Sequence, residues 1–505
     1  MSLLSDIIEQ GQRVAAHRPW PRAVVTADTW QRLRGELAEG KLTLIGLWGD
    51  IGIVHMALLD EAGPDIGVVS LECPDGRFPA IGFVHKPAAR LERAVRDLFG
   101  LEPSGLGDVR PWLDHSRWDL WQPLGNGSHE PRPSQPYAFL PVEGEGLHQI
   151  PVGPVHAGII EPGHFRFTAN GEAVVRLEER LGYVHKGIES LMVGADLARG
   201  IRLAGRTSGD STVAYALAFA HAAEAALGLS VPPRAAWLRA LMAELERLAN
   251  HFGDFGAICN DASFAIMHAQ CGILRERTLR VAATCFGHRL MMDRIMPGGI
   301  SNDVPANGLA QLRELIAEIQ RSFPRLVALY DNTASLQDRT VTTGVLKAAL
   351  ARQFGAGGFV GRASGRAFDA RRALAYPPYD QLAFEVPVVK TGDVNARVWI
   401  RIHEIEQSMR LIDQIIASLP EGPLSAPAEA AGGAAAEGLG IVEGFRGDVL
   451  VWLRLDGERR IARCHLRDPS WFQWPLLEAV IEGNIVADFP ICNKSFNCSY
   501  SGHDL

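Results

Sequence analysis

Apolar residues recur at helical spacing in two long stretches of the second half of the chain, 234–254 and 398–419. The repeat is about three to four residues, and polar residues occupy the opposite positions. Two long amphipathic helices of this kind predict a helical bundle. The apolar positions are Leu238, Leu241, Met242, Leu245, Leu248 and Phe252 in the first stretch, and Val398, Ile402, Ile405, Met409, Ile412, Ile416 and Leu419 in the second.

The beginning of the chain has a different pattern, with short runs rich in β-branched and apolar residues between Gly, Asp and Pro turns. After them, residues 86–100 carry Pro near the start and Gly at the end, which is typical of a helix. Strands followed by a helix predict an open sheet with helical cover. The four predicted strands are 42–48, 52–59, 66–72 and 78–84.

Composition shifts suggest where these two regions separate. Residues 125–136 are polar and rich in Gly and Pro, as linkers are. We therefore predict an α+β fold with an N-terminal open-sheet domain, a linker and a mainly helical domain with small hairpins. Hairpin turns are expected at Asn170-Gly171 and Asp456-Gly457, and residues 425–440, low in complexity, are expected to form a loop insertion. The predicted bounds are 1–124, 125–147 and 148–505.

Charge and cysteine content exclude several functional classes. The 505 residues carry a net charge of -8, which gives no reason to expect nucleic acid as a partner. No run of eighteen apolar residues and no signal peptide are present, so we expect a cytoplasmic chain that contacts a membrane only through partners. The seven cysteines form no Cys-x-x-Cys motif, so we expect free thiols and no metal or cluster within this chain.

The stretch 206–224, RTSGDSTVAYALAFAHAAE, is the strongest candidate for chemistry. Ser208 and Ser211 are three residues apart, and Tyr215 follows four residues later. If Asp210 or Ser211 caps the Ala-rich run, these side chains line the first turns of one helix face. Cysteines at that spacing would bind a soft metal, but here the thiols are replaced by hydroxyls.

Five long motifs occur in the order of one known family. The chain from about residue 148 resembles the large subunit of group 4 membrane-bound [NiFe] hydrogenases and the 49-kDa family of respiratory complex I. Residues 78–124 resemble the 30-kDa family of complex I, whose role is docking. The motifs are GPVHAGIIEPGHFRF (153–167), GEAVVRLEERLGYVHKGIE (171–189), ELERLANHFGDFGAICND (244–261), GRASGRAFDARR (361–372) and TGDVNARVWIRIHEIEQS (391–408).

The resemblance implies roles for several more residues. His156 matches a hairpin histidine near the quinone cavity of complex I, and His164 follows at wider spacing; a structural role for both is the alternative. Glu189 matches an acidic anchor that orients a helix, relays protons or pairs with Lys or Arg. Arg206 matches an arginine near the iron-sulfur cluster of the small partner subunit, and its alternative is an ion pair within the bundle.

Active relatives hold nickel with four thiolates, two of them in a C-terminal Cys-x-x-Cys. Here the first pair is Ser208 and Ser211, and Cys492 and Cys498 are separated by five residues, so Cys492 remains as one conceivable ligand. The family's quinone-binding tyrosine position falls on Gly209. We therefore expect no hydrogenase activity, and a polar pocket around Asp210 and Tyr215 in which quinone binding is possible.

The resulting hypothesis is a large-subunit component of a membrane-associated oxidoreductase complex that couples electron transfer to a membrane arm without a [NiFe] centre. Its implied partners are a small subunit with a [4Fe-4S] cluster and antiporter-like membrane subunits. Its implied location is the inner face of the cell membrane. A quinone-reducing NADH dehydrogenase-like subunit and a non-catalytic scaffold remain alternatives, with ionisable Asp210, Tyr215, His156 and Glu189 favouring retained chemistry.

Overall fold

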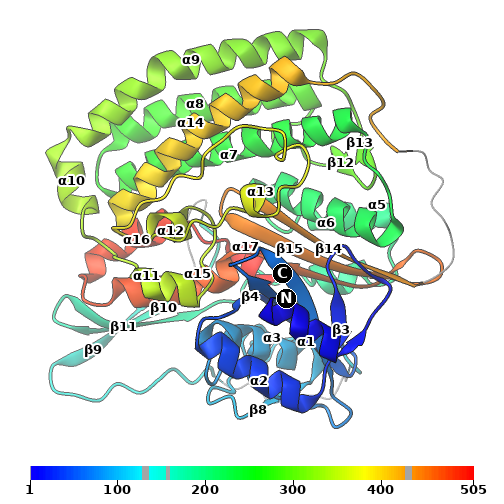
Figure 1. Cartoon of the computed structure of the whole chain (residues 1–505). Helices are drawn as coiled ribbons and strands as arrows, with labels where there is room; N and C mark the ends of the chain where they lie inside the picture. The colour runs from blue at the N-terminus through cyan, green and yellow to red at the C-terminus, as the bar shows by residue number, and fades with distance from the viewer. Residues whose placement is uncertain (1, 128–135, 155–159, 427–434) are drawn as a thin grey trace.

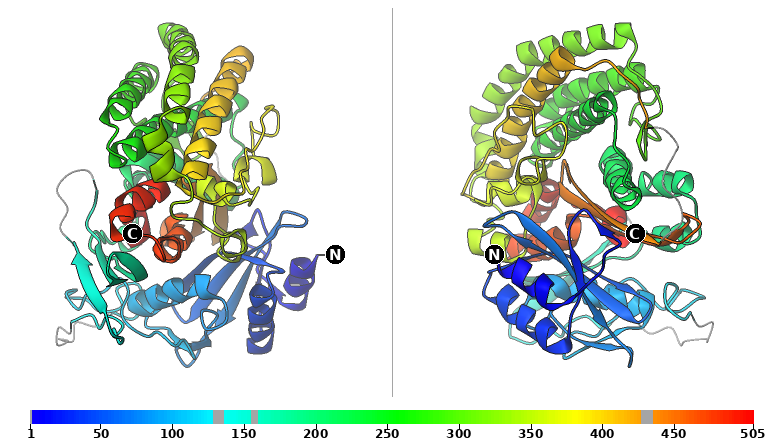
Figure 2. Two further views of the ribbon diagram at one scale, coloured as in Figure 1. Left: turned by 90° about the vertical axis from the view of Figure 1, so that its left-hand side faces the viewer. Right: turned by 45° about the vertical axis from the view of Figure 1, so that its right-hand side comes forward.

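The computed structural model describes residues 2–127, 136–154, 160–426 and 435–505. Long helices lie side by side at one end of the molecule, and the N-terminal sheet with its helices lies at the other (Figures 1 and 2). Between them stands a hairpin sheet from the last quarter of the chain. The mixture of helices with several small sheets confirms the α+β prediction.

The N-terminal sheet is a meander with a parallel strand added at its edge. Strands β4, β5 and β6 pair antiparallel, and β3 lies parallel to β6. Helices α1 (Leu3–Gln10), α2 (Ala27–Ala38) and α3 (Ala89–Phe99) accompany the sheet. The strand order β1-β3-β6-β5-β4 is built from Gln12–Arg13, Arg22–Val24, Asp65–Glu72, Ile53–Asp60 and Thr43–Asp50.

The predicted fourth strand, 78–84, is mostly wrong. Only β7 (Arg77–Pro79) is extended, and it pairs in parallel with β8 (Glu102–Ser104) outside the main sheet. The backbone N–H groups of Ile81 and Gly82 instead donate to the buried carboxyl group of Glu92 at 2.5 and 3.0 Å. That contact with α3 replaces the ladder that a continued strand would need.

Both predicted long helices are confirmed as α7 (Pro233–Asp261) and α14 (Val394–Ser418). Every predicted apolar position of α7 is buried. Its polar residues Arg239, Glu246 and Arg247 are buried as well, because other elements cover that face. The remaining large helices are α6 (Thr212–Leu227), α8 (Ala265–Phe286) and α9 (Ala306–Asp331).

Shorter helices connect these long ones and close the molecule after the last strand. None of the helices in the described ranges combines the length and apolarity needed to cross a bilayer. The shorter helices are α4 (Ile188–Met192), α5 (Leu197–Ala204), α10 (Ala334–Thr340), α11 (Ala348–Gln353), α12 (Gly358–Ala363), α13 (Ala370–Ala373), α15 (Ser470–Ile481), α16 (Phe489–Phe496) and α17 (Tyr500–Asp504).

Both predicted hairpin turns are confirmed, by β10 and β11 and by β15 and β16. The expected loop 425–440 is wrong at its end, because β14 already begins at Ala436. Gly438 and Gly440 let β14 lie directly against α6: a Cβ atom there would stand 1.8 and 2.1 Å from the carbonyl oxygens of Ala222 and Ala218. The strands are β9 (Leu147–Val152), β10 (His164–Asn170), β11 (Ala173–Arg180), β12 (Ile295–Met296), β13 (Gly299–Ile300), β14 (Ala436–Gly444), β15 (Gly447–Leu455) and β16 (Ile461–Arg467).

The N-terminal sheet and the hairpin sheet pack against each other through a shared apolar core. Trp48 of β4 contacts Trp452 of β15 and stacks on His465 of β16. Strand β2 (His17–Arg18) pairs with β14, and nearby Arg22 forms a buried ion pair with Glu437 at 2.6 Å. The beginning of the chain therefore helps to hold the strands that carry the candidate site. The domain bounds at 124 and 147 stay predictions.

Candidate functional site

A cavity of about 470 Å³ lies where α7, the residues before α6, the β14–β15 turn and the end of the chain meet. Its lining is rich in polar and charged side chains. The turn contributes Arg446, and the residues before α6 contribute Ser208 and Asp210. Other lining residues include Asn250, Asp254, His268, Arg275, Lys494, Asn497, Cys498, Ser499 and Ser501.

Asp210 and Arg446 form a bidentate ion pair at this cavity, with nitrogen to oxygen distances of 2.8 and 2.6 Å. Ser208 donates to Asp210 at 2.7 Å, and Ser211 donates to it at 3.3 Å. Burial by itself would raise the pKa of Asp210, but the guanidinium group of Arg446 and the hydroxyl of Ser208 hold this pKa well below its usual range. The carboxylate therefore stays charged at neutral pH.

The loop before α6 is held by contacts from α7. Glu246 accepts the backbone N–H groups of Val213 and Ala214 at 2.7 and 3.1 Å, and Asn250 donates to the backbone oxygen of Asp210 at 2.8 Å. The cap of α6 thus comes from another helix, and neither Asp210 nor Ser211 makes a side-chain cap. The sequence pattern had instead suggested that the side chain of Asp210 or Ser211 caps this helix.

Arg446 reaches the cavity because β14 and β15 reverse direction at this residue. The reversal places Gly447 at φ +132°, and Gly358 lies so close that a Cβ atom on it would stand 2.1 Å from the Arg446 carbonyl oxygen. The Arg446 side chain then donates to Asp210, to Ser211 at 3.1 Å and to the carbonyl oxygen of Asn497. One guanidinium group thereby joins three separate segments of the chain.

The end of the chain supplies a second cavity wall. Ser499 and Ser208 are joined by a hydroxyl to hydroxyl contact of 3.1 Å, and Ser499 also caps α17 by accepting from the backbone N–H of Gly502 at 2.9 Å. Cys498 and Ser501 both line the cavity at the same three-residue spacing as Ser208 and Ser211. Burial raises the pKa of the Cys498 thiol well above its ordinary value, so it is a neutral thiol at pH 7.

Cys492, the candidate ligand from the sequence, lies elsewhere. It is fully buried on α16, and its sulfur lies 2.6 Å from where a Cβ atom on Gly344 would be. The residue does not line the cavity, whereas Cys498 does. The missed signal was the Cys498-x-x-Ser501 spacing, which repeats the spacing of Ser208 and Ser211 at the other end of the domain.

A second ion cluster lies beside the Asp210 pair. Asp254 accepts from Asn497 at 2.9 Å, lies 3.3 Å from the Lys494 ammonium group and 3.2 Å from the Arg401 guanidinium group. Burial opposes the charge of Asp254, but these cations lower the pKa of its carboxyl group. The cavity is consequently lined by charges of both signs.

Tyr215 is not part of the cavity wall. Its ring is fully buried, and its hydroxyl donates to Asp468 at 2.7 Å. Because α6 begins only at Thr212, Tyr215 lies on the first turn facing the C-terminal segment. The predicted grouping of Ser208, Ser211 and Tyr215 on one helix face is therefore wrong, because Ser208 and Ser211 precede α6 and Tyr215 lies on it.

Glu189 is also remote from this cavity. Its carboxylate accepts from the His465 ring at 2.9 Å, from the Leu466 backbone N–H at 3.0 Å, and pairs with Arg463 at 2.8 Å. Burial opposes ionisation, yet Arg463 and His465 lower the pKa of Glu189 to about 2. Of its three expected roles, pairing with a cation is the one for which the structure gives a partner.

The remaining predicted residues are also separate. Arg206 is 42% exposed and pairs with Asp293 at 2.6 Å, which is an ion pair outside the bundle core. His164 is buried at the start of β10, where its ring lies 3.3 Å from the Gly153 carbonyl oxygen and packs on Phe139. His156 lies outside the described residues.

The donor set matters for any metal at this cavity. Among the described residues, no group of three or more His, Cys, Asp and Glu side chains is arranged to hold a metal ion. All seven cysteines are free and buried. The positions with paired spacing here are Ser208, Ser211, Cys498 and Ser501, and three hydroxyls with one neutral thiol do not fit a soft-metal centre that requires four thiolates.

Known proteins are similar in sequence to most of this chain. The family model of the respiratory-chain NADH dehydrogenase 49-kDa subunit matches residues 264–433 and 429–504. Formate hydrogenlyase subunit 5 of Escherichia coli K12 is 32% identical over 432 residues, which cover 82% of this chain and 74% of that protein. The chain belongs to the 49-kDa subunit family.

Two further proteins of known complexes are similar to this chain. Hydrogenase-4 component G of Escherichia coli K12 is 29% identical over 466 residues, covering 89% of this chain and 80% of that protein. A chain of the membrane-bound sulfane sulfur reductase, an archaeal respiratory membrane complex, has a TM-score of 0.68 and 25% identity, covering 72% of this chain and 100% of its own length. The resemblance expected from the sequence is confirmed for the large-subunit part, and the 30-kDa resemblance of the N-terminal part stays a prediction.

Proposed function

We propose that this 49-kDa family member is the large-subunit component of a membrane-associated oxidoreductase complex of the hydrogenase-4 and complex I type. In this proposal it couples electron transfer at the Asp210 cavity to the membrane arm and works without a [NiFe] centre. One observation carries the proposal: the cavity combines an ion pair, the partly exposed Asp210 with the buried Arg446, with hydroxyl groups at spacings where active relatives hold thiolates.

The donor chemistry is the reason for excluding nickel. A serine hydroxyl ionises only at far higher pH than a thiol and binds soft metals poorly. Ser208 and Ser211 moreover direct their hydroxyl protons to Asp210, so both hydroxyls are donors here. The one cavity cysteine, Cys498, is a neutral thiol because burial raises its pKa.

The same residues are suited to proton movement beside an electron acceptor. Ser499, Ser208 and Asp210 form a hydrogen-bonded series that ends at a carboxylate kept charged by Arg446. A hydroxyl both accepts and donates a proton, so Ser499 and Ser208 can relay a proton to a cavity ligand while the charged Asp210 carboxylate orients the Ser208 hydroxyl. Arg446 and Asp254 present opposite charges to the cavity. These charges would orient the electron acceptor, and the two side chains would take no part in the reaction.

The proposed partners follow the family. An iron-sulfur small subunit with a [4Fe-4S] cluster would supply electrons, and antiporter-like membrane subunits would receive the coupled change. Arg206 supports the first contact because it lies at the surface, where a partner that displaces its Asp293 pair would bring the cation beside a cluster and stabilise an added electron there. This arrangement would place the chain on the inner face of the cell membrane.

A second candidate concerns the acceptor. The similarity to a chain of a sulfane sulfur reductase, together with Cys498 at the cavity, favours a sulfane sulfur compound over a quinone. Reduction of its S–S bond needs two electrons and two protons. Asp210 stays charged and holds no proton to give, so the Ser499 and Ser208 hydroxyls would relay protons that enter the cavity from solvent. A quinone needs the same electrons and protons, so activity has to separate the two.

The test is a set of assays on the complex purified with its native partners. Reduced methyl viologen supplies electrons, and hydrogen, sulfide and quinol are measured together with nickel content. We expect substoichiometric nickel, no hydrogen, and turnover with a sulfane sulfur compound or a quinone that Asp210→Asn lowers at least tenfold. The matched variant Asp331→Asn, on an exposed position at the end of α9, should retain activity.

Two outcomes would contradict the proposal. Stoichiometric nickel with hydrogen evolution would show that the hydroxyl-lined site holds the metal after all. Activity of an intact Asp210→Asn complex equal to that of the unmodified complex would leave only the scaffold alternative. Gel filtration of each variant complex separates loss of chemistry from loss of assembly.

A further inference from the structure

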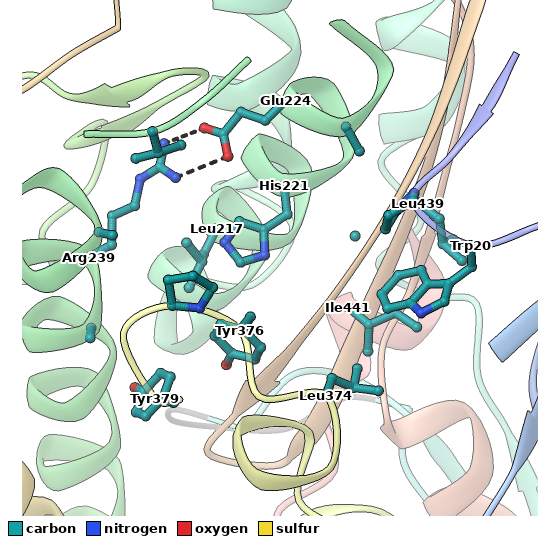
Figure 3. A pocket seen from close by; sticks show the side chains of 17 residues that line it. Trp20, Leu217, His221, Glu224, Arg239, Leu374, Tyr376, Tyr379, Leu439 and Ile441 are labelled. Carbon is teal, nitrogen blue, oxygen red and sulfur yellow. Dashed lines mark hydrogen bonds and ion pairs between the residues drawn. The ribbon is translucent and has the colours of Figure 1, made fainter. Parts of the chain in front are cut away.

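A second cavity, of about 390 Å³, lies between α6, α7, β14 and the loop that follows α13. Its walls come from α6, α7, β14, the segment 374–379 and the residues that follow β2 (Figure 3). No lining residue is shared with the Asp210 cavity. The volume falls within the range of about 300–1,000 Å³ that is usual for small-molecule sites.

The walls of this cavity are mainly apolar and aromatic. Trp20 stands on one side, and the rings of His221 and Tyr376 stand on the other (Figure 3). Leu217 and Ile441 fill the wall between α6 and β14. Flat aromatic walls of this kind stack on planar rings, with centroid separations of about 4.5–7 Å.

Two polar groups at the cavity retain hydrogen-bonding capacity. His221 makes no hydrogen bond within the described part of the chain and contacts the Tyr376 ring edge to face at 5.3 Å. The Tyr376 hydroxyl accepts from the Glu443 backbone N–H at 3.2 Å, so its own proton remains to be donated. Burial lowers the pKa of His221 to about 4 against the opposing charge of Glu224, which leaves a neutral ring with one donor and one acceptor.

The charges at the cavity neutralise each other. Arg239 and Glu224 form a buried pair at 2.6 Å, drawn dashed in Figure 3. Arg239 also donates to the carbonyl oxygens of Met296 and Gly299, and Glu224 accepts from the Gly298 backbone N–H. With their hydrogen bonds satisfied, these groups offer no free charge to an anionic or cationic ligand.

We propose that this cavity binds a neutral planar ring compound that carries one hydroxyl or carbonyl group. The ring lies between Trp20 and Tyr376, and its polar group bonds to His221 or to the Tyr376 hydroxyl. The inference stands on the geometry of this cavity alone and does not rest on the proposed redox function. Because Trp20 comes from the N-terminal part of the chain, occupancy also joins that part to the helical bundle.

The experiment measures binding of two neutral probes, 2-naphthol and naphthalene, to the full chain by equilibrium dialysis at pH 7. We expect saturable binding of one equivalent of each. Ala236→Phe places a ring in the cavity and should abolish binding of both probes, while Ala310→Phe, the same change on an exposed position of α9, should leave it unchanged. Circular dichroism establishes that both variants are folded.

The polar contact is tested with His221→Leu, which keeps an apolar side chain of similar size. Loss of one hydrogen bond should weaken 2-naphthol binding about three- to tenfold and leave naphthalene binding unchanged. Equal weakening of both probes would contradict the assigned role of His221. Absence of saturable binding, or binding that survives Ala236→Phe, would overturn the proposal as a whole.

Discussion

Two clusters of polar side chains in this 49-kDa family member each contain an arginine–carboxylate pair but face different surroundings. The bundle network consists of Arg362, Glu404, Glu443, Asp369, Arg371 and Glu244, and the site cluster consists of Ser208, Asp210, Ser211, Arg446 and Ser499. Every member of the bundle network is at most 3% exposed. Asp210, in contrast, is 35% exposed at its side chain and borders the cavity.

The connections differ in the same way. Arg362 lies within 2.7 to 2.8 Å of Glu404 and Glu443, and Arg371 joins Asp369 and Glu244 at 2.7 and 2.9 Å. Each of these charges is satisfied by groups of the protein, so the network has little capacity for a ligand. The site cluster uses one bidentate pair for structure and leaves hydroxyl and carboxylate edges on a cavity. Charged side chains that are fully buried and paired with one another are thus structural, and charged side chains beside a cavity are the better indicator of function.

The largest expected effect is on stability, from Arg362→Met in the bundle network. Removing this cation leaves the buried Glu443 without an ion-pair partner among the described residues and takes one partner from Glu404 and from Asp369, which costs about 3–5 kcal/mol of unfolding free energy. Urea denaturation of the full chain measures this cost. Arg410→Met on an exposed position of α14 is the matched control and should change stability by less than about 0.5 kcal/mol. Equal losses of stability for Arg362→Met and Arg410→Met would contradict the structural role of the bundle network.

A smaller effect is expected from Tyr215→Phe, next to the site cluster but outside the cavity wall. The change removes the hydroxyl that bonds to Asp468, and one such hydrogen bond contributes about 0.5–1.5 kcal/mol. Turnover of the purified complex should stay within twofold of the unmodified complex, because Tyr215 does not line the cavity. Stability is followed by denaturation and turnover by the viologen assay. Loss of turnover at unchanged stability would place Tyr215 in the mechanism and contradict its assignment as structural.

The smallest effect concerns acid stability. The pKa of Asp210 is lower in the folded chain than its ordinary value of 3.8, so its stabilising contribution is present above that pH and is lost as the pH falls through the folded pKa. Asp210→Asn should therefore be less stable than the unmodified chain at pH 7, and this difference should shrink below about pH 4. Solvent screening of the partly exposed side chain keeps the difference small. Denaturation curves between pH 3 and pH 7 check it, and a constant difference would mean that the Asp210 charge is not the cause.

The sequence by itself determined the elements whose signal is local. The apolar repeat of α7 and α14 and the turns of the β10–β11 and β15–β16 hairpins depend on residues a few positions apart, and the structure agrees with them. The three-residue spacing of Ser208 and Ser211 likewise pointed to the segment whose residues 208–210 form one wall of the cavity. Motif order was sufficient to indicate the family, since long motifs in order are a specific signal.

Tertiary structure decided everything that depends on distant partners. Arg446 is 236 residues from Asp210, and Cys498 belongs to the same cavity as Ser208 although no local pattern links them. Residues 436–440 have the composition of a loop, yet they extend as β14 because two glycines allow contact with the α6 backbone. Periodicity tells which side of an element is apolar, whereas burial of the polar side and the pairing of charges depend on which other segment packs there.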